Sequence, residues 1–254
     1  MHPVQPLFKP SPPITEPVTK FGGQPVWLAE PTWPISRELG TQMVFLGQVR
    51  LPGAEPRLAY LFMTEDADEY VDGTWEPEGG ENACLVQPGP VPSFVGTAPQ
   101  ATGPTYDDQD YAVELVVPTG ELSCGDTIIG GEPIWLQSPE WSEGDWRFVG
   151  QLGELPFKQE SNFGDAGTAY AFVDESSWEG RFLWQCPPTY LPSQLPSLRR
   201  PSSMSAVAPA KEKRTNSWPC TGSKSMPGTI ATPVSSRSLR QKAIESSVRC
   251  LMSA

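Results

Sequence analysis

The chain has 254 residues, with 30 acidic and 18 basic side chains, and its formal net charge is −12. This length predicts one or two domains. No apolar run reaches the roughly 18 residues that a membrane-spanning helix needs, so we expect no membrane segment. The 30 prolines, 23 glycines and nine tryptophans favour short extended segments joined by turns over a helical protein.

Charge divides the chain into an acidic body and a basic tail. Residues 187–254 hold ten basic and two acidic side chains (net +8), whereas residues 1–186 hold eight basic and 28 acidic ones (net −20). The tail is rich in serine and proline and its apolar residues are scattered, so we predict that residues 191–254 are disordered. The acidic body argues against direct nucleic-acid binding, which needs cations against the phosphates, and leaves the tail as a weak RNA-binding candidate.

The N-terminal residues have a composition of their own. Six prolines fall within the first 17 residues, which predicts a flexible, extended arm over residues 1–17. This stretch has no apolar core of signal-peptide length, so we do not expect secretion. Five cysteines without a CxxC pair indicate free thiols in a reducing compartment. We therefore expect a cytoplasmic protein, with the nucleus as the alternative location.

One twelve-residue stretch occurs twice. GGQPVWLAEPTW begins at Gly22 and GGEPIWLQSPEW begins at Gly130, and seven of the twelve positions are identical. Further blocks recur in the same order: VFLGQV and RFVGQL, AYLFM and AYAFV, a Trp-Glu pair, and CLVQP and FLWQC. Recurrence in one order predicts an internal duplication, with copies at about residues 20–88 and 128–186.

The repeated blocks predict strands. AYLFM and AYAFV carry aromatic residues at a spacing of two, which places both rings on one face of a sheet. Residues 111–118 add a strand between the copies, and the prolines of the Gly-Gly block place that block at a sheet edge. We predict a mostly β fold, with a β-rich α+β fold as the alternative. Two similar β units would pack face to face into one domain over residues 18–190.

Taken together, these blocks resemble the YwqG-like family, a domain of unknown function. The resemblance is carried by Gly-Gly-x-Pro-x-Trp-Leu, by Phe-x-x-Gln and by residues 162–167 and 182–185, and it covers residues 18–186. It implies a β-rich, duplicated fold that is distantly similar to the domain of programmed cell death protein 2, whose relatives escort a ribosomal protein. Those relatives carry a cysteine-rich zinc insert that this chain lacks, and the family supplies no catalytic residues.

The sequence offers few residues for catalysis. Its only histidine is His2, which argues against histidine-dependent nucleophiles and histidine-ligated zinc. We expect Cys84 and Cys186, at strand ends, to pack and not to react. Asp165 is the sharpest acidic candidate, either as a general acid/base or cation ligand or as a cap of backbone amides in a turn. The acidic runs 64–69 and 107–110 lack calcium-site spacing and are expected to be solvated loops, so we predict no metal and no cofactor.

Glutamines recur at matching places, Gln48 with Gln151 and Gln87 with Gln185. A buried amide needs hydrogen-bond partners, because an unpaired one costs roughly 1–3 kcal/mol. Such glutamines either bond to backbone across the two halves, fixing their register, or line a groove and recognise amide groups of a ligand.

Three functions follow as alternatives. The one we favour is a non-enzymatic, chaperone-like binding module whose acidic surface attracts a basic polypeptide. A carboxylate-dependent enzyme would use Asp165 with a second acid from the acidic loops. A carbohydrate-binding module would use exposed tryptophans, which otherwise pack in the core. The candidate binding residues are Trp27, Trp135, Gln48, Gln151, Asp165 and Gln185.

Overall fold

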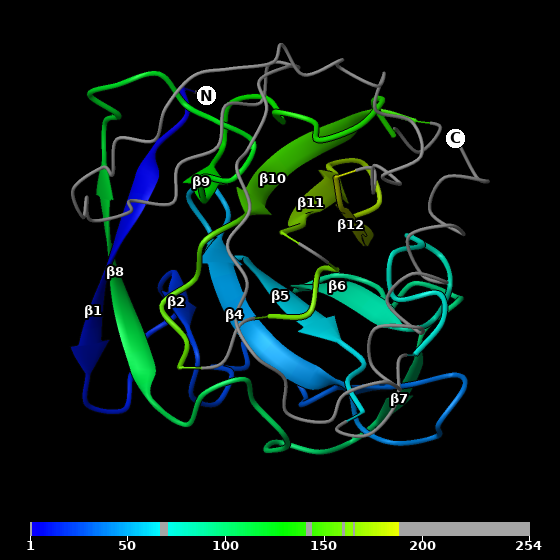
Figure 1. The fold of residues 1–254 in the computed structure, drawn as a ribbon. Coiled ribbons are helices and arrows are strands. Elements are labelled where there is room, and N and C mark those ends of the chain that lie inside the picture. Colours follow the sequence, from blue (N-terminus) through cyan, green and yellow to red (C-terminus); the bar gives the residue numbers. More distant parts are fainter. Residues whose placement is uncertain (1, 67–70, 141–143, 159–160, 165, 188–254) are drawn as a thin grey trace, which may run out of the picture.

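The computed structural model describes residues 2–66, 71–140, 144–158, 161–164 and 166–187 (Figure 1). Within these ranges the chain forms β-strands and no α-helix, which confirms the mostly β prediction. No helix that could cross a membrane occurs in this part of the chain. The tail predicted to be disordered lies outside the described residues, as do Trp141 and Asp165.

The described strands form three antiparallel sheets. Their bounds are β1 Gln5–Ser11, β2 Lys20–Phe21, β3 Trp33–Ile35, β4 Val44–Arg50, β5 Leu58–Met63, β6 Asn82–Gln87, β7 Gly96–Ala98, β8 Asp110–Val116, β9 Ile128–Ile129, β10 Trp146–Leu152, β11 Thr168–Asp174 and β12 Gly180–Gln185. The first sheet has the order β1-β8-β2-β4-β5-β6, the second has the order β12-β11-β10-β9, and β3 pairs with β7. The strand predicted between the copies is β8.

The two copies share one strand pattern. Strands β4, β5 and β6 correspond to β10, β11 and β12, and the two-residue strands β2 and β9 pair with β4 and β10 at equivalent places. The register of β4 against β5 shifts between Phe45 and Gly47, and that of β10 against β11 shifts between Phe148 and Gly150. Because even this bulge recurs at the matching position, the structure confirms the internal duplication.

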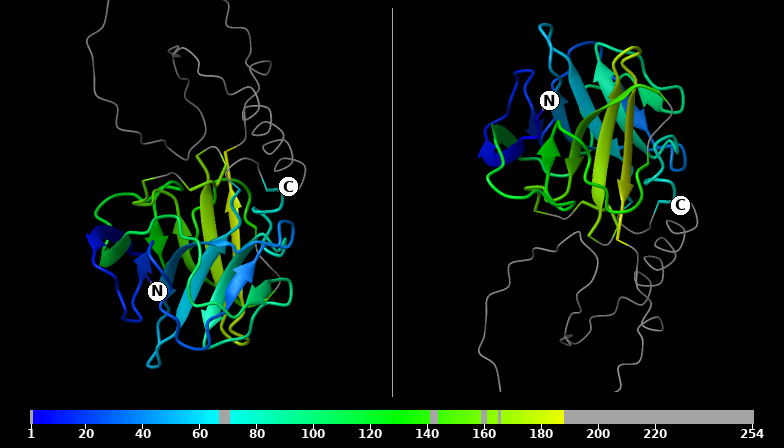
Figure 2. Two further views of the ribbon diagram at one scale, coloured as in Figure 1. Left: turned by 90° about the horizontal axis from the view of Figure 1, so that it is seen from below. Right: turned by 90° about the horizontal axis from the view of Figure 1, so that it is seen from above.

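The two large sheets pack face to face over one apolar interior (Figure 2). Leu46 and Leu61 contribute from the first sheet, and Val149 and Ala171 from the second. Strands β6 and β12 also approach each other closely. A Cβ atom added to Gly180 would lie 2.1 Å from the Cys84 carbonyl oxygen, so this approach requires glycine.

Each sheet is covered on its outer face as well. Trp33 and Trp27 belong to the cluster on the first sheet, and Trp135 belongs to the matching cluster on the second. Both faces of the central strands are therefore buried, and β5 is buried at every residue. The prediction that the Gly-Gly-x-Pro-x-Trp segments lie at a sheet edge is wrong for the first copy, where the segment follows β2, which lies between β8 and β4. In the second copy the segment follows β9, the edge strand of its sheet. Beyond the glycines, both segments run over the outer faces, where Trp27 and Trp135 pack.

The N-terminal segment is part of the first sheet. Strand β1 pairs with β8 along its whole length, and on its other side Val4 exchanges backbone hydrogen bonds with Ile129 at 3.0 and 2.9 Å. Alternate residues of a strand point their N–H groups to opposite sides. Pro6 and Pro10 are in phase with Val4, so they lack only N–H groups that would face away from β8. The prediction of a flexible arm over residues 1–17 is therefore wrong for β1.

The bulge glycines explain why Gly-Gln recurs. A Cβ atom on Gly150 would lie 2.6 Å from the Ile128 carbonyl oxygen, and one on Gly47 would lie 2.8 Å from the Lys20 carbonyl oxygen. Gly150→Ala is therefore expected to lower the free energy of unfolding by roughly 1–3 kcal/mol, measured by urea denaturation. Gly120→Ala is the control, because no atom lies within 4 Å of its added Cβ. Equal stability of the two variants would contradict this account.

Candidate functional site

In the first copy, side chains of the sheet bind the segment that crosses its outer face. The Gln48 Oε1 accepts a hydrogen bond from the Val26 amide at 2.9 Å. The Tyr60 hydroxyl accepts one from the Leu28 amide at 3.1 Å and donates one to the Val26 carbonyl at 2.8 Å. The Gln87 Oε1 also accepts from the Leu28 amide, at 3.1 Å. We call Gln48, Tyr60 and Gln87 the Gln-Tyr-Gln set of this copy.

The second copy repeats the Gln-Tyr-Gln set with Gln151, Tyr170 and Gln185. The Gln151 Oε1 accepts from the Ile134 amide at 2.9 Å, and the Tyr170 hydroxyl accepts from the Leu136 amide at 3.0 Å. The Gln185 side chain donates to the Ser138 carbonyl at 2.9 Å. The prediction that the glutamines bond across the two halves is wrong, because each set binds the backbone of its own copy or of the residues just before that copy.

The hydrogen bonds within the Gln-Tyr-Gln sets leave the candidate binding glutamines few free donors or acceptors for a ligand. Gln48 and Gln151 are fully buried, and backbone groups of the protein occupy both ends of their amides. Burial raises the pKa of Tyr60 and that of Tyr170, so both hydroxyls stay neutral and can donate and accept at once.

The tryptophans cover these sets. The ring of Trp27 lies 4.9 Å from that of Tyr60, and the ring of Trp135 lies 4.5 Å from that of Tyr170, both measured between centroids. Both tryptophans are half-buried and have equivalent surroundings in the two copies. Part of each ring surface is therefore used in packing on the sheet.

The candidates for nucleophilic chemistry are placed unfavourably for it. Cys84 and Cys186 are buried, as expected of packing residues, and burial raises the pKa of the Cys84 thiol to about 12. Cys124 is disulfide-bonded, so the expectation of free thiols is wrong at that position. His2 is exposed. No group of three or more potential metal ligands gathers within the described ranges.

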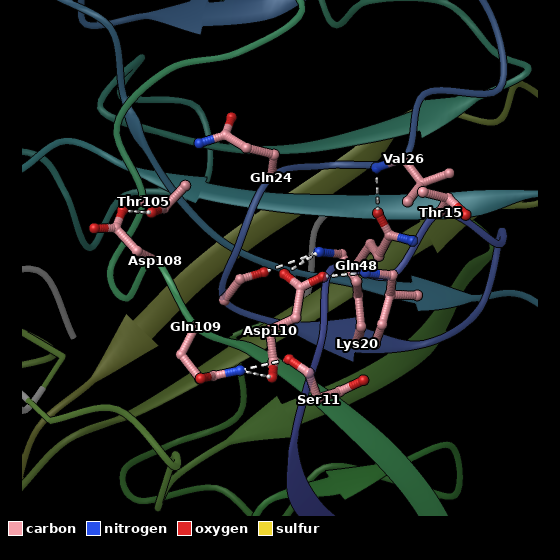
Figure 3. A network of polar contacts seen from close by, with 12 residues as sticks. Ser11, Thr15, Lys20, Gln24, Val26, Gln48, Thr105, Asp108, Gln109 and Asp110 are labelled. Atoms are coloured by element: carbon pink, nitrogen blue, oxygen red, sulfur yellow. Dashed lines mark hydrogen bonds and ion pairs between the residues drawn. The ribbon is translucent and has the colours of Figure 1, made fainter.

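Two carboxylates of the acidic run 107–110 are buried, so the prediction of a solvated loop is wrong for them. Asp110 pairs with Lys20 at 2.7 Å between Oδ1 and Nζ, and their side chains are 6% and 0% exposed (Figure 3). Asp107 accepts a hydrogen bond from the Tyr111 hydroxyl at 3.0 Å. A Cβ atom on Gly23 would lie 1.3 Å from the Asp110 Oδ1, so the repeated glycine leaves room for this carboxylate. Both aspartates therefore have partners within the protein and stabilise its fold.

Another carboxyl group, Glu65, belongs to the acidic loop of the first copy and contacts both the segment between the copies and the long loop of the second. It accepts hydrogen bonds from the Tyr106 hydroxyl and from the Asn162 amide. Burial raises the pKa of Glu65 despite these bonds. Burial and the neighbouring Glu65 charge also raise the pKa of Tyr106. The loop that follows Asn162 contains Asp165, whose position is outside the described residues.

Glu65 predicts a pH dependence of stability. A folded-state pKa above the unfolded value stabilises the protein fully below the ordinary glutamate pKa, and this stabilisation is lost as pH rises through the raised pKa. Relative to Glu65→Gln, the wild-type protein should therefore lose unfolding free energy across this pH interval. Urea denaturation at a series of pH values checks this, with the exposed Glu55→Gln as control. Parallel profiles of the wild type and Glu65→Gln would refute it.

A cavity of about 560 Å³ opens between the two copies. Its walls come from β8, the end of β4, β9 and the start of β10, and the charged residues of its lining are Arg50 and Arg147. No carboxylate is among the described lining residues. The larger apolar side chains of the lining are Val4, Val18, Val49, Leu51, Val113, Leu115, Ile129, Phe148 and Val149. The cavity contains none of the predicted binding residues.

Comparison with protein-family models, with curated proteins and with solved structures finds no significant match to this chain. The resemblance to the YwqG-like family therefore stays a prediction.

Proposed function

We propose that this protein is a non-enzymatic binding module that holds an extended segment of a basic polypeptide. The observation that carries the proposal is the cavity at the junction of the two copies. Its volume falls within the roughly 300–1,000 Å³ of ligand sites, and its lining is mostly apolar with a few polar groups, as such sites usually are. A cytoplasmic location, with the nucleus as the alternative, belongs to the same proposal.

Strand β8 supports an extended occupant. Strand β2 pairs with β8 only at Tyr111 and Ala112, whereas β1 pairs with it as far as Val116. The end of β8 therefore has a strand partner on one side only. Leu115 and Val18, which line the cavity beside this open edge, are 47% and 40% exposed. An open strand edge with exposed apolar side chains is the kind of surface to which an extended peptide adds.

The charge of the body favours a basic client. Residues 1–186 carry a net charge of −20, which raises the encounter rate with a cationic polypeptide and makes binding sensitive to salt. The resemblance to relatives of a ribosomal-protein escort points to the same class of client.

Affinity capture from cell extract tests this function. We expect the full chain to recover basic proteins at low salt and to release them at roughly 0.5 M salt, where charges are strongly screened. An unrelated acidic protein of similar net charge serves as control bait for simple ion exchange. Recovery of the same proteins on both baits, or recovery that does not vary with salt, would contradict the proposal.

A carboxylate-dependent enzyme is the second candidate, and Glu65 is the observation that favours it. Its pKa is raised and it contacts the loop that contains Asp165. If the protein is such an enzyme, Asp165→Asn should abolish its activity and leave the melting temperature nearly unchanged, whereas a large loss of stability would support a turn-capping role.

The carbohydrate-binding alternative draws no support from the packed tryptophans, and we expect constant tryptophan fluorescence across a panel of glycans.

A further inference from the structure

We propose that the cavity between the copies recognises a carboxylate carried by an apolar, extended peptide, and that Arg147 binds this carboxylate. The inference rests on the proposed function, because it takes the occupant of the cavity to be a polypeptide segment. It adds the chemistry of the group that is recognised.

Arg147 has hydrogen-bonding capacity that the described residues do not use. Its Nη1 pairs with the Glu175 Oε1 at 2.7 Å, whereas its Nη2 is buried and has no hydrogen-bond partner there. A buried donor without a partner is costly, and a guanidinium group binds a carboxylate through two parallel hydrogen bonds. The side chain lines the cavity and is 28% exposed, so a ligand reaches the guanidinium group from the cavity, and binding at the buried Nη2 requires this group to turn.

The local charge of the cavity is opposite to that of the whole body. Arg50 is the second cation of the lining, and its backbone and side chain are fixed by bonds to the Thr19 hydroxyl at 2.9 Å and the Pro17 carbonyl at 3.3 Å. The described lining contains two arginines and no carboxylate, and Glu175, outside the lining, offsets part of the Arg147 charge, so the cavity is weakly cationic within an acidic protein. It would therefore favour an anionic group on a client that is otherwise basic.

The walls of the cavity favour an extended peptide with apolar side chains beside that carboxylate. Pro6 lies opposite Leu115 in the register and is in phase with Val4, which bonds away from β8. By the same alternation, Leu115 points its N–H and C=O away from β1, toward the open edge. A peptide laid along this edge could bond to Leu115 and pack its apolar side chains on Val18 and Val113.

Peptide binding to the full chain, followed by fluorescence anisotropy, tests the inference. The probe is a fluorescein-labelled Gly-Val-Ile-Val-Leu peptide with a free C-terminal carboxylate, compared with the same peptide as its C-terminal amide. We expect the carboxylate to bind about tenfold tighter or more, since a hydrogen bond to a charged group is stronger than one between neutral groups. Arg147→Gln should abolish this difference, and Glu175→Gln should strengthen carboxylate binding by freeing Arg147.

Two further variants separate recognition from folding. Arg37→Gln changes an exposed arginine outside the cavity and should bind both peptides as the wild type does. Leu115→Glu introduces a negative charge at a half-exposed lining position and should abolish carboxylate binding while thermal unfolding stays close to that of the wild type.

The outcomes distinguish this inference from the proposed function. Equal affinities for the carboxylate and the amide, or an Arg147→Gln protein that still discriminates between them, would overturn the inference. If neither peptide binds while basic proteins are still captured in a salt-dependent way, the inference fails and the proposed function stands. If the carboxylate peptide binds as expected and no basic protein is captured, carboxylate recognition by the cavity is supported, and the proposal of a basic client is contradicted.

Discussion

Replacing Gln151 with leucine should lower the free energy of unfolding by about 3 kcal/mol, because it leaves several buried backbone groups without partners. The Gln151 Oε1 accepts from the Ile134 amide, and its Nε2 donates to the carbonyl oxygens of Ser123, Cys124 and Asp126. Leucine has a similar volume but can make none of these bonds. Urea denaturation monitored by tryptophan fluorescence measures the loss.

Two other glutamines make the comparison specific. Gln48→Leu removes the equivalent bonds in the first copy and should destabilise the protein to a similar degree. Gln24 also bonds to backbone, at Gly103, but it is exposed, so Gln24→Leu should change stability by about 0.5 kcal/mol or less. If Gln151→Leu behaved like Gln24→Leu, the structural role of the Gln-Tyr-Gln sets would be refuted.

Removing Asp110 should have the largest effect, a loss of roughly 3–5 kcal/mol for Asp110→Ala, because it leaves a buried lysine without its counter-charge. Lys20 Nζ lies 2.7 Å from the Asp110 Oδ1 and 3.2 Å from the Gly22 carbonyl oxygen, in the first sheet. Burial lowers the pKa of Lys20, and Asp110 opposes that shift. Without Asp110, the deficit should therefore shrink as the pH rises toward the ordinary lysine pKa.

A double variant tests whether the cost is that of the unpaired charge. Lys20→Met combined with Asp110→Leu removes both charges and should recover most of the stability lost in Asp110→Ala, as replacement of buried ion pairs by apolar residues often does. Chemical denaturation of the single and double variants forms a complete cycle. A double variant that is no more stable than Asp110→Ala would show that the loss comes from altered packing.

The duplication could be predicted because its residues perform local tasks that recur. Glycine is repeated at Gly47 and Gly150, where a bulge brings a neighbouring backbone carbonyl close to the missing Cβ. Glutamine is repeated at Gln48 and Gln151, where a buried amide binds the segment that covers the sheet. The sequence showed that these positions matter, but not which backbone the amides would bind, because that depends on the path of the covering segments.

Features that depend on distant pairing were not predicted. Lys20 and Asp110 lie 90 positions apart, and nothing in the run 107–110 distinguishes a buried aspartate from a solvated one. The proline content of β1 indicated an arm, because the phase of Pro6 and Pro10 relative to a partner strand is not visible in the sequence. The cavity was missed for the same reason, since its walls come from strands of both copies and its open side depends on the short β2.

Residue-resolved amide hydrogen exchange tests most directly whether both copies hold their outer segments with the same buried side chains. The amides of Val26 and Ile134 lie outside every strand, yet each donates to a buried glutamine. We expect both amides to exchange as slowly as those in the middle of β5 and β11, and to lose this protection in Gln48→Leu and Gln151→Leu respectively. Exchange of both amides at the rate of an exposed loop in the wild-type protein would contradict the account.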